Sequence, residues 1–216
     1  RETCHWGCRT TPRSFAPVRR ATGKRITLVW PPTVDGTPPR PSLNLAYLTA
    51  SLERADPSLE VSCIDVNLVL DLDNVITVPL VEARRHLSHA LLLIERTRPD
   101  ILAVGAWTSN LPFALELVRA FRPRHPNVPV VMGGYPATEG PAELLSILPE
   151  ADVLVRGEGE ATLPGLVDRL VTGRPFDDVQ GLSYRRGTEV VHTPPAIPLN
   201  DLDALPFPSY ERFVGA

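Results

Sequence analysis

Cysteine, lysine and methionine are scarce in this sequence of 216 residues, which contains 3 cysteines, a single lysine and 1 methionine. So few thiols give no framework of disulfides, and we therefore expect a reducing, cytoplasmic compartment. The lysine, Lys24, precedes the first predicted strand, which excludes a Schiff-base or phosphate-loop lysine from the folded part. The methionine, Met132, lies inside a predicted strand, so we expect the sequence to be a fragment, a processed product or a trimmed chain.

Long apolar runs and a strong excess of one charge are also absent. No run reaches the roughly eighteen apolar residues that span a membrane, and the net charge is only -3 with 22% charged residues. These values predict neither a membrane nor a nucleic acid as a partner. With 43% hydrophobic residues, the chain is long enough for one well-buried α/β domain with extensions and too short for two sizeable domains.

Five apolar segments of strand length alternate with five helical patterns. The strands are expected near 26–30, 59–65, 101–106, 128–134 and 151–155, and the helices near 43–54, 81–98, 112–122 and 161–171, with a further amphipathic segment between 138 and 151. Such alternation predicts a parallel sheet covered on both faces, with right-handed crossovers. We expect a Rossmann-like or flavodoxin-like α/β domain with a five-stranded parallel sheet over residues 25–173.

The segments on either side of this domain have other patterns. Residues 1–24 are basic and lack hydrophobic periodicity, which predicts a tail or linker, with a targeting peptide as an alternative. Cys4 and Cys8 have a spacing that metal ligands use, but Thr11 stands where a Cys-x3-Cys-x2-Cys cluster motif has its third cysteine. Residues 174–216 predict a β-hairpin, which turns at Arg186 and Gly187, and then a proline-rich linker.

Glycine pairs end two of the predicted strands. Gly133 and Gly134 end one strand, Gly157 and Gly159 end the next, and a helical pattern comes after each pair. Because parallel strands end at the same edge of a sheet, these loops would form one rim of a ligand crevice, where backbone without Cβ atoms approaches the ligand closely. The other ligand loops are expected at 31–43 and 107–110.

The same residues also have interpretations without a ligand. The first glycine pair is then a simple turn between strand and helix. Glu158 and Glu160 then lie in a helix cap, near the positive end of the helix. Trp107 and Tyr135 become aromatic residues of the core.

Short motifs occur along the chain in a particular order. A strand ending in Pro-Pro precedes Leu45-Ala-Tyr-Leu48, and a strand ending in Val-Gly is followed by Thr-Ser. Val-Val-Met-Gly-Gly-x-x-Ala-Thr and Val-Arg-Gly-Glu-Gly-Glu come next, and Gly-Leu-Ser-Tyr-Arg and Leu-Pro-Phe-Pro close the series. This ordered set covers about residues 24–213, and it resembles the cobalamin-binding domain of cobalamin-dependent radical S-adenosylmethionine (SAM) enzymes.

The resemblance implies a corrinoid lying across the carboxyl edge of the sheet, with its nucleotide tail buried between strands and helices. The implied cobalamin-binding residues are Pro31, Pro32, Thr108, Ser109, Gly133, Gly134, Tyr135, Gly157, Glu158, Gly159 and Glu160. The motif Asp-x-His-x-x-Gly, whose histidine ligates cobalt in other corrinoid proteins, is absent. We therefore expect cobalamin without a histidine lower ligand, with Ser109 or Tyr135 lining its lower face.

The resemblance also implies a place within a larger enzyme. The chain would be the amino-terminal domain of a radical SAM methyltransferase that uses methylcobalamin, and 174–216 would lead to a missing radical SAM barrel in cis, which holds SAM and a 4Fe-4S cluster. The chain alone is not expected to be catalytic, because it has no three-cysteine motif, no evident Ser/His/Asp set and no usable lysine nucleophile. Two alternatives remain: a stand-alone corrinoid carrier or sensor, and a flavodoxin-like domain that binds a flavin or nucleotide.

Overall fold

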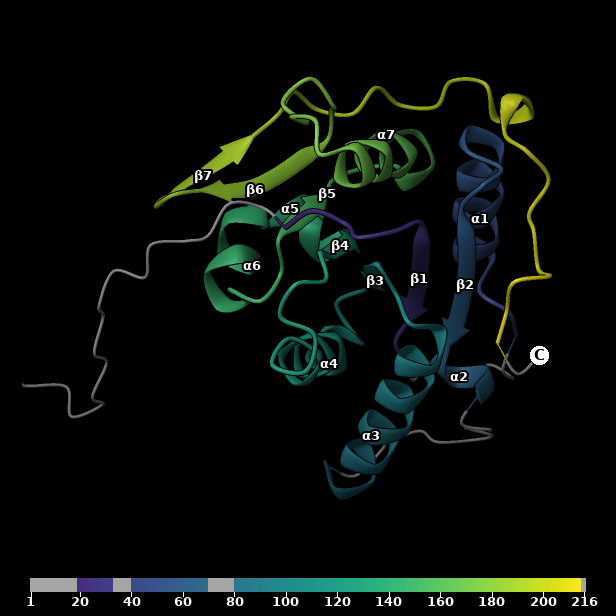
Figure 1. Cartoon of the computed structure of the whole chain (residues 1–216), viewed down its shortest axis with the longest axis vertical. Helices are drawn as coiled ribbons and strands as arrows, with labels where there is room; N and C mark the ends of the chain where they lie inside the picture. Colours follow the sequence, from purple (N-terminus) through teal and green to yellow (C-terminus); the bar gives the residue numbers. More distant parts are fainter. Residues whose placement is uncertain (1–18, 33–39, 70–79, 215–216) are drawn as a thin grey trace, which may run out of the picture.

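A seven-stranded sheet organises the chain, and helices cover both of its faces (Figure 1). The computed structural model describes residues 19–32, 40–69 and 80–214, so Cys4, Cys8 and Thr11 lie outside the described residues. The strands are β1 (Arg25–Trp30), β2 (Glu60–Asp65), β3 (Ile101–Ala106), β4 (Val130–Gly134), β5 (Val153–Val155), β6 (Leu182–Arg186) and β7 (Glu189–His192). Their order in the sheet is β2-β1-β3-β4-β5-β6-β7. Strands β1 to β5 run parallel, and β6 and β7 pair in antiparallel fashion.

The described helices divide between the two faces of the sheet. On one face lie α1 (Leu43–Ala55) and α7 (Gly159–Thr172), which contact each other. The opposite face is covered by α3 (Leu80–Thr97), α4 (Leu111–Phe121), α5 (Tyr135–Glu139) and α6 (Pro141–Ile147). A short helix, α2 (Val66–Val69), follows β2, and a 3-10 helix spans Leu202–Ala204. Among all of these, no helix has the length and apolar character that crossing a membrane requires.

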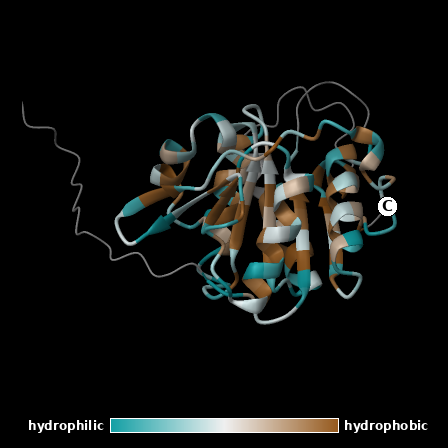
Figure 2. Cartoon of the chain, turned by 90° about the horizontal axis from the view of Figure 1, so that it is seen from above, coloured by the Kyte–Doolittle hydropathy of each residue, from teal (hydrophilic) through white to brown (hydrophobic). Residues whose placement is uncertain are grey.

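Alternate side chains of the parallel strands belong to two separate hydrophobic cores. Leu28 of β1 packs in the core beneath α1 and α7, whereas its neighbour Val29 packs in the core beneath α3 and α4. Because helices cover both faces, both sets of side chains are apolar in the central strands, and β3 is a continuous apolar run. The predicted fold class, a parallel sheet with helices on both faces, is therefore confirmed (Figure 2).

The expectation of five strands is too low for the sheet as a whole. The predicted hairpin forms as β6 and β7, but it is not a separate unit, because β6 pairs with β5 through partners such as Val153 and Tyr184. Leu182 and Tyr184 are buried in the same core as α7. Without β6, the three-residue strand β5 would be an edge strand with unpaired backbone groups. The hairpin covers this edge. Sequence patterns predict a hairpin but not the edge to which it attaches.

The proline-rich segment after the hairpin lies on the body of the molecule. We call residues 193–214 the strap, since this segment passes α7 and α1 and ends beside the outer edge of β2 (Figure 1). The N–H of Ser209 donates to the carbonyl of Ala46 at 3.0 Å, and the N–H of Cys63 donates to the carbonyl of Arg212 at 2.8 Å. Phe213 is buried at this end, with 8% of its surface exposed. The segment that the sequence suggests is a linker thus adds a contact to the edge strand β2.

The helices on both faces end and begin in different ways. Gly173, with φ of 67°, ends α7 in the left-handed conformation. The amphipathic segment between 138 and 151 contributes to two short helices, α5 and α6, which meet at Gly140. Ser42 occupies the N-cap of α1, but its side chain makes no capping bond. Its backbone N–H instead donates to Oδ2 of Asp65 at 3.0 Å, which ties the start of α1 to the end of β2.

Candidate functional site

A cavity of about 240 Å³ opens at the carboxyl edge of the sheet, between the sheet and the helices α1 and α7. The cavity lies beside two neighbouring strands whose connections go to opposite faces of the sheet. Strand β1 leads to α1 on one face, and β3 leads to α4 on the other. Loops that leave adjacent parallel strands toward opposite faces open a crevice between them, which is the usual ligand site of such sheets. A cavity thus opens at the edge where the ligand loops are predicted.

The strands form the floor of the cavity in two rows. Leu28, Ala103 and Val131 lie in register on β1, β3 and β4. The next row toward the carboxyl edge holds the paired residues Gly105 and Gly133, flanked by Trp30 and Val155. The floor is therefore apolar. It is hollow at Gly133, whereas the ring of Trp30 occupies the space beside Gly105, where a Cβ atom would lie 2.9 Å from that ring.

The two glycines that end β4 have different roles. A Cβ atom on Gly133 would meet no atom closer than 3.8 Å, so the backbone tolerates one there and the missing side chain leaves open space. Gly134 has φ of 96°, and a Cβ atom there would lie 2.2 Å from the carbonyl oxygen of Ala106. Gly133 thus shapes the cavity, and Gly134 is required by the backbone.

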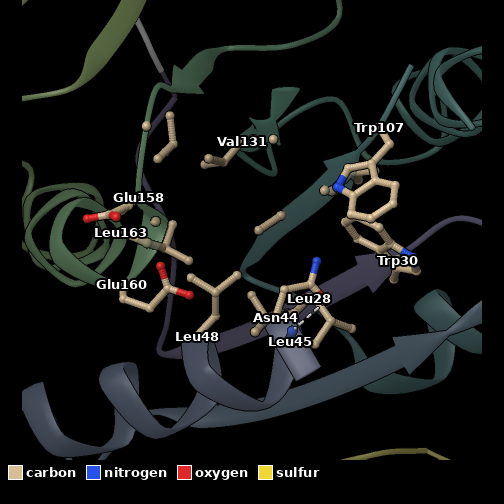
Figure 3. A pocket seen from close by; sticks show the side chains of 18 residues that line it. Leu28, Trp30, Asn44, Leu45, Leu48, Trp107, Val131, Glu158, Glu160 and Leu163 are labelled. Atoms are coloured by element: carbon tan, nitrogen blue, oxygen red, sulfur yellow. Dashed lines mark hydrogen bonds between the residues drawn. The ribbon is translucent and has the colours of Figure 1, made fainter. Parts of the chain in front are cut away.

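The first turns of α1 and α7 form the walls. Leu45 and Leu48 face the cavity from α1, Leu163 faces it from α7, and Asn44 lies at its α1 side (Figure 3). A Cβ atom on Gly159 would lie 2.8 Å from Cδ2 of Leu48, so this glycine lets the two helices approach closely. Both helices begin at the carboxyl edge, and their first turns therefore border the mouth.

The loop between β5 and α7 forms one side of the mouth. The N–H of Gly157 donates to Oγ1 of Thr138 at 2.9 Å, and Oε2 of Glu158 accepts a hydrogen bond of 2.6 Å from the N–H of Leu199 on the strap. Glu160 lies at the cavity between Leu48 and Leu163 (Figure 3). Burial, and to a smaller degree the charge of Glu158, raises the pKa of Glu160 above its ordinary value. The mouth thus carries a carboxyl group in an apolar setting.

Aromatic residues border the cavity on its β3 side. Trp30 is buried, and its ring meets that of Trp107 edge to face with centroids 5.8 Å apart. Trp107 and Tyr135 are 57% and 59% exposed, so the alternative that they belong to the core is wrong. Together with Thr108 and Ser109 they border a second, shallow hollow, which adjoins the cavity through Trp107.

The predicted site residues fall into three groups in the structure. Those that line the cavity are Gly133, Gly134, Gly157, Glu158, Gly159 and Glu160. Those that border the second hollow are Thr108, Ser109 and Tyr135. Pro31 and Pro32 line neither, although the carbonyl of Pro31 accepts a hydrogen bond of 3.2 Å from the side chain of Asn110, which joins the loops after β1 and β3.

Sequence reasoning missed the apolar part of the cavity. The missed residues include Leu28, Trp30, Asn44, Leu45, Leu48, Ala103, Gly105, Val131, Val155 and Leu163. The available signal was the helical spacing of Leu45, Leu48 and Leu52, which puts these leucines on one face of α1. Helical spacing predicts that a face is covered, but it does not tell a protein neighbour from a cavity.

Histidines and metal clusters do not contribute to the cavity. The described histidines are His86, His89, His125 and His192, and none is among the lining residues. His86 is half-buried and His89 exposed on α3, and Nε2 of His125 lies 3.4 Å from Oε1 of Glu95. Within the described ranges, no three His, Cys, Asp or Glu side chains gather as a metal site.

A model of the family described as "B12 binding domain" matches residues 39–167, more than half of the chain. The chain belongs to this family. The match includes the helix α1, the strands β2 to β5 and the first turns of α7. It therefore covers most of the cavity. It confirms the resemblance found in the sequence and favours a corrinoid over the flavin or nucleotide alternative.

Several proteins are similar to this B12-binding domain. The uncharacterised methyltransferase PH0819 of Pyrococcus horikoshii is 35% identical over 193 residues, which are 87% of this chain and 38% of that protein. The cobalamin-dependent radical SAM methyltransferase TokK of Streptomyces tokunonensis is 35% identical over 111 residues, covering 51% of this chain and 16% of TokK.

A solved structure adds a similarity of fold. The radical SAM methyltransferase TsrM from Kitasatospora setae, solved with tryptophan and a SAM analogue, matches with a TM-score of 0.61 and 25% identity, covering 82% of this chain and 31% of TsrM. The chain is thus a B12-binding domain homologous to cobalamin-dependent radical SAM methyltransferases. It spans less than two fifths of the length of each of these proteins.

Proposed function

We propose that this domain binds cobalamin with the base of its nucleotide tail in the cavity and its corrin ring across the carboxyl edge of the sheet. The observation that carries the proposal is the hollow at Gly133, where the cavity floor lacks a side chain. Because a Cβ atom at Gly133 would meet no atom closer than 3.8 Å, the missing side chain leaves room that the protein itself does not use. A flat base fits a cavity of about 240 Å³, whereas the much larger corrin ring must stay outside it.

Polar groups at the mouth suit the rest of the ligand. Asn44 and Glu160, on the first turns of the two wall helices, offer hydrogen bonds to the sugar of the tail. The second hollow offers the hydroxyl groups of Thr108 and Ser109 beside exposed aromatic surface, which suits a large ring with peripheral amides. In this proposal, the residues of the chain bind the ligand, fix its orientation and exclude water from its base.

We further infer that the cobalt has no histidine as its lower ligand. No histidine occurs between residues 6 and 85, so the loop after β1 offers none. None of the described histidines lines the cavity or the second hollow. Ser109 and Tyr135, at the second hollow, are the residues proposed for the lower face.

We infer that the domain serves a radical SAM methyltransferase. The support is similarity to TokK and TsrM; TsrM has also been solved with cobalamin and a 4Fe-4S cluster bound. Bound cobalamin supplies a cobalt centre that carries a methyl group, and its surroundings tune that reactivity. The proposal assigns SAM and the cluster to a radical SAM barrel in cis. A stand-alone carrier would bind cobalamin equally well but would have no such barrel.

The visible absorption spectrum of the chain tests this function. The chain is incubated with hydroxocobalamin, desalted and reduced, and electron paramagnetic resonance of the cobalt(II) state is then recorded. We expect retained corrinoid and no splitting from a nitrogen lower ligand. A colourless protein that is folded by circular dichroism would overturn corrinoid binding. Nitrogen splitting would overturn either the absence of a histidine ligand or the placement of the base in the cavity, because the base of free cobalamin itself ligates cobalt through a nitrogen.

A further inference from the structure

The innermost part of the cavity floor consists of hydrocarbon. Leu28, Ala103 and Val131 form one row across β1, β3 and β4, and Leu45 and Leu163 face the cavity from the helices. The backbone of this row is engaged in the parallel ladder, because each of the three strands has a paired strand on both sides. The floor therefore presents no hydrogen-bonding group to a ligand.

Hydrogen-bonding side chains lie at the mouth instead. Asn44 is the second residue of α1 and Glu160 the second residue of α7, whereas Leu48 and Leu163 lie about one turn further along their helices. Glu158 already accepts a hydrogen bond from the strap. The other polar groups among the lining side chains are the indole N–H groups of Trp30 and Trp107. These two residues lie at the carboxyl ends of β1 and β3.

We propose that this cavity selects corrinoids by the base of their tail, accepting an apolar benzimidazole and discriminating against a purine such as adenine. The inference rests on the proposed function, because it concerns the same cavity. The amino group and ring nitrogens of adenine would lose water on entering and find no partner on the floor, which weakens binding. Dimethylbenzimidazole instead presents methyl groups to Leu28, Ala103 and Val131, and burying them is favourable.

Three ligands measured on the unmodified chain test the inference. Isothermal titration compares cobalamin, the corrinoid that carries adenine as its base, and cobinamide, which has no nucleotide tail. We expect the adenine corrinoid to bind roughly 10- to 100-fold more weakly than cobalamin. Affinities of the two within about twofold of each other would overturn the inference and leave the proposed function intact. Failure of cobalamin itself to bind would overturn the function.

A matched pair of variants identifies the cause of the selectivity. Val131→Thr places a hydroxyl group on the floor, and Val130→Thr makes the same change one residue earlier, where the side chain belongs to the opposite core. We expect the difference between the two corrinoids to shrink by up to roughly tenfold in Val131→Thr and to stay as in the unmodified chain in Val130→Thr. An unchanged difference in a folded Val131→Thr protein would overturn the apolar floor as the cause.

Discussion

Single residues decide where this domain is hollow and where it is rigid. The sequence alone predicted the glycines that end β4 and those that follow β5, because a glycine pair between an apolar run and a helical pattern has a distinct local signature. It did not predict the role of Gly105, which makes room for the ring of Trp30, because that contact depends on the register between β1 and β3. Register between strands is a tertiary property, and no local pattern fixed it here.

Gly134 is the residue whose replacement the backbone tolerates least. With φ of 96° and a Cβ position 2.2 Å from the carbonyl oxygen of Ala106, alanine would be both strained and in collision. We expect Gly134→Ala to lower the free energy of unfolding by about 2 kcal/mol, and so to lower the melting temperature by roughly 4–8 °C. Gly140→Ala is the control, since its Cβ would meet no atom closer than 3.4 Å. Equal melting temperatures of the two variants would contradict this assignment.

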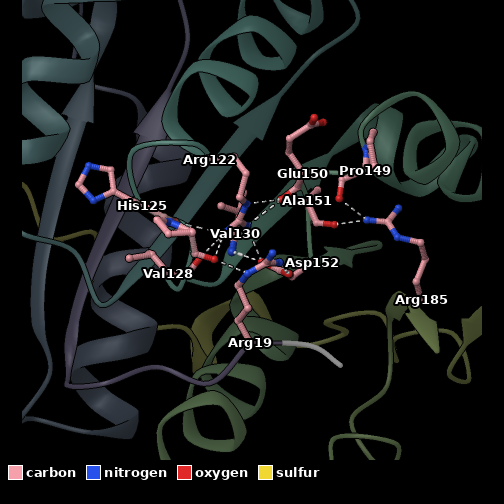
Figure 4. A network of polar contacts seen from close by, with 11 residues as sticks. Arg19, Arg122, His125, Val128, Val130, Pro149, Glu150, Ala151, Asp152 and Arg185 are labelled. Atoms are coloured by element: carbon pink, nitrogen blue, oxygen red, sulfur yellow. Dashed lines mark hydrogen bonds and ion pairs between the residues drawn. The ribbon is translucent and has the colours of Figure 1, made fainter. Parts of the chain in front are cut away.

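Asp152 holds the opposite end of the sheet together (Figure 4). Its Oδ2 accepts hydrogen bonds from the N–H of Val130 at 2.8 Å and from Arg122 at 2.7 Å, and its Oδ1 pairs with Arg19. The side chains of Arg122 and Asp152 are only 11% and 5% exposed, and burial lowers the pKa of Arg122. Removing the carboxylate would leave the buried guanidinium of Arg122 without its ion-pair partner.

We therefore expect Asp152→Ala to destabilise the fold by about 3–5 kcal/mol in urea unfolding. The matched change Asp178→Ala also breaks an ion pair with an arginine, but Asp178 is 68% exposed. An exposed pair contributes below about 1 kcal/mol. Similar losses in the two variants would show that burial does not decide the strength of these pairs.

Glu160 makes stability depend on pH in a defined direction. Its raised pKa, caused first by burial and then by the charge of Glu158, means that the fold favours the protonated carboxyl group. Ionisation therefore opposes folding. The stability that this side chain contributes is lost as pH rises from the ordinary pKa of a glutamate through the raised pKa of Glu160.

Urea unfolding of the wild type and of Glu160→Gln, between about pH 4 and pH 8, measures this contribution. We expect the variant to gain stability relative to the wild type as pH rises, because its side chain does not ionise. Groups that both proteins share, such as Asp56 with its lowered pKa, cancel in the difference. A difference that does not change with pH would contradict a raised pKa of Glu160.

At the level of elements, the hairpin and the strap complete both edges of the sheet. The sequence predicted the hairpin from its turn residues, but it placed the hairpin and the strap outside the domain. In the structure, β6 covers the edge of β5, and the strap contacts the edge of β2 at Cys63. These attachments join residues far apart in the sequence, so local patterns carried no signal for them. The strap also contacts the mouth of the cavity, through Glu158.

Phe213 is expected to anchor the strap. It is 8% exposed and packs in the core beneath α1 and α7, whereas Phe207 on the same strap is 96% exposed. We expect Phe213→Ala to increase the rate of proteolysis within 193–214 by at least roughly tenfold, because a segment that opens more often is cleaved more often. Phe207→Ala should leave the rate unchanged. Equal rates in both variants would rule out Phe213 as the anchor.

At the level of the whole molecule, the order of elements largely determines where a ligand binds. Alternating strands and helices predicted a parallel sheet with both faces covered, and the parallel part of the observed sheet has the five predicted strands. The crevice follows from β1 and β3 sending their helices to opposite faces. The sequence predicted the loops at this edge, but not the apolar cavity beneath them, because its walls and floor come from α1, α7 and four strands.

The affinity of matched glycine variants for cobalamin tests the central claim most directly. Gly133→Val fills the hollow in the floor, whereas Gly140→Val adds the same side chain at the start of α6, outside the lining residues. In isothermal titration, we predict that the dissociation constant rises at least roughly 100-fold in Gly133→Val and does not change in Gly140→Val, with both proteins folded. Binding of cobalamin to Gly133→Val with the affinity of the wild type would contradict the placement of the ligand in this cavity.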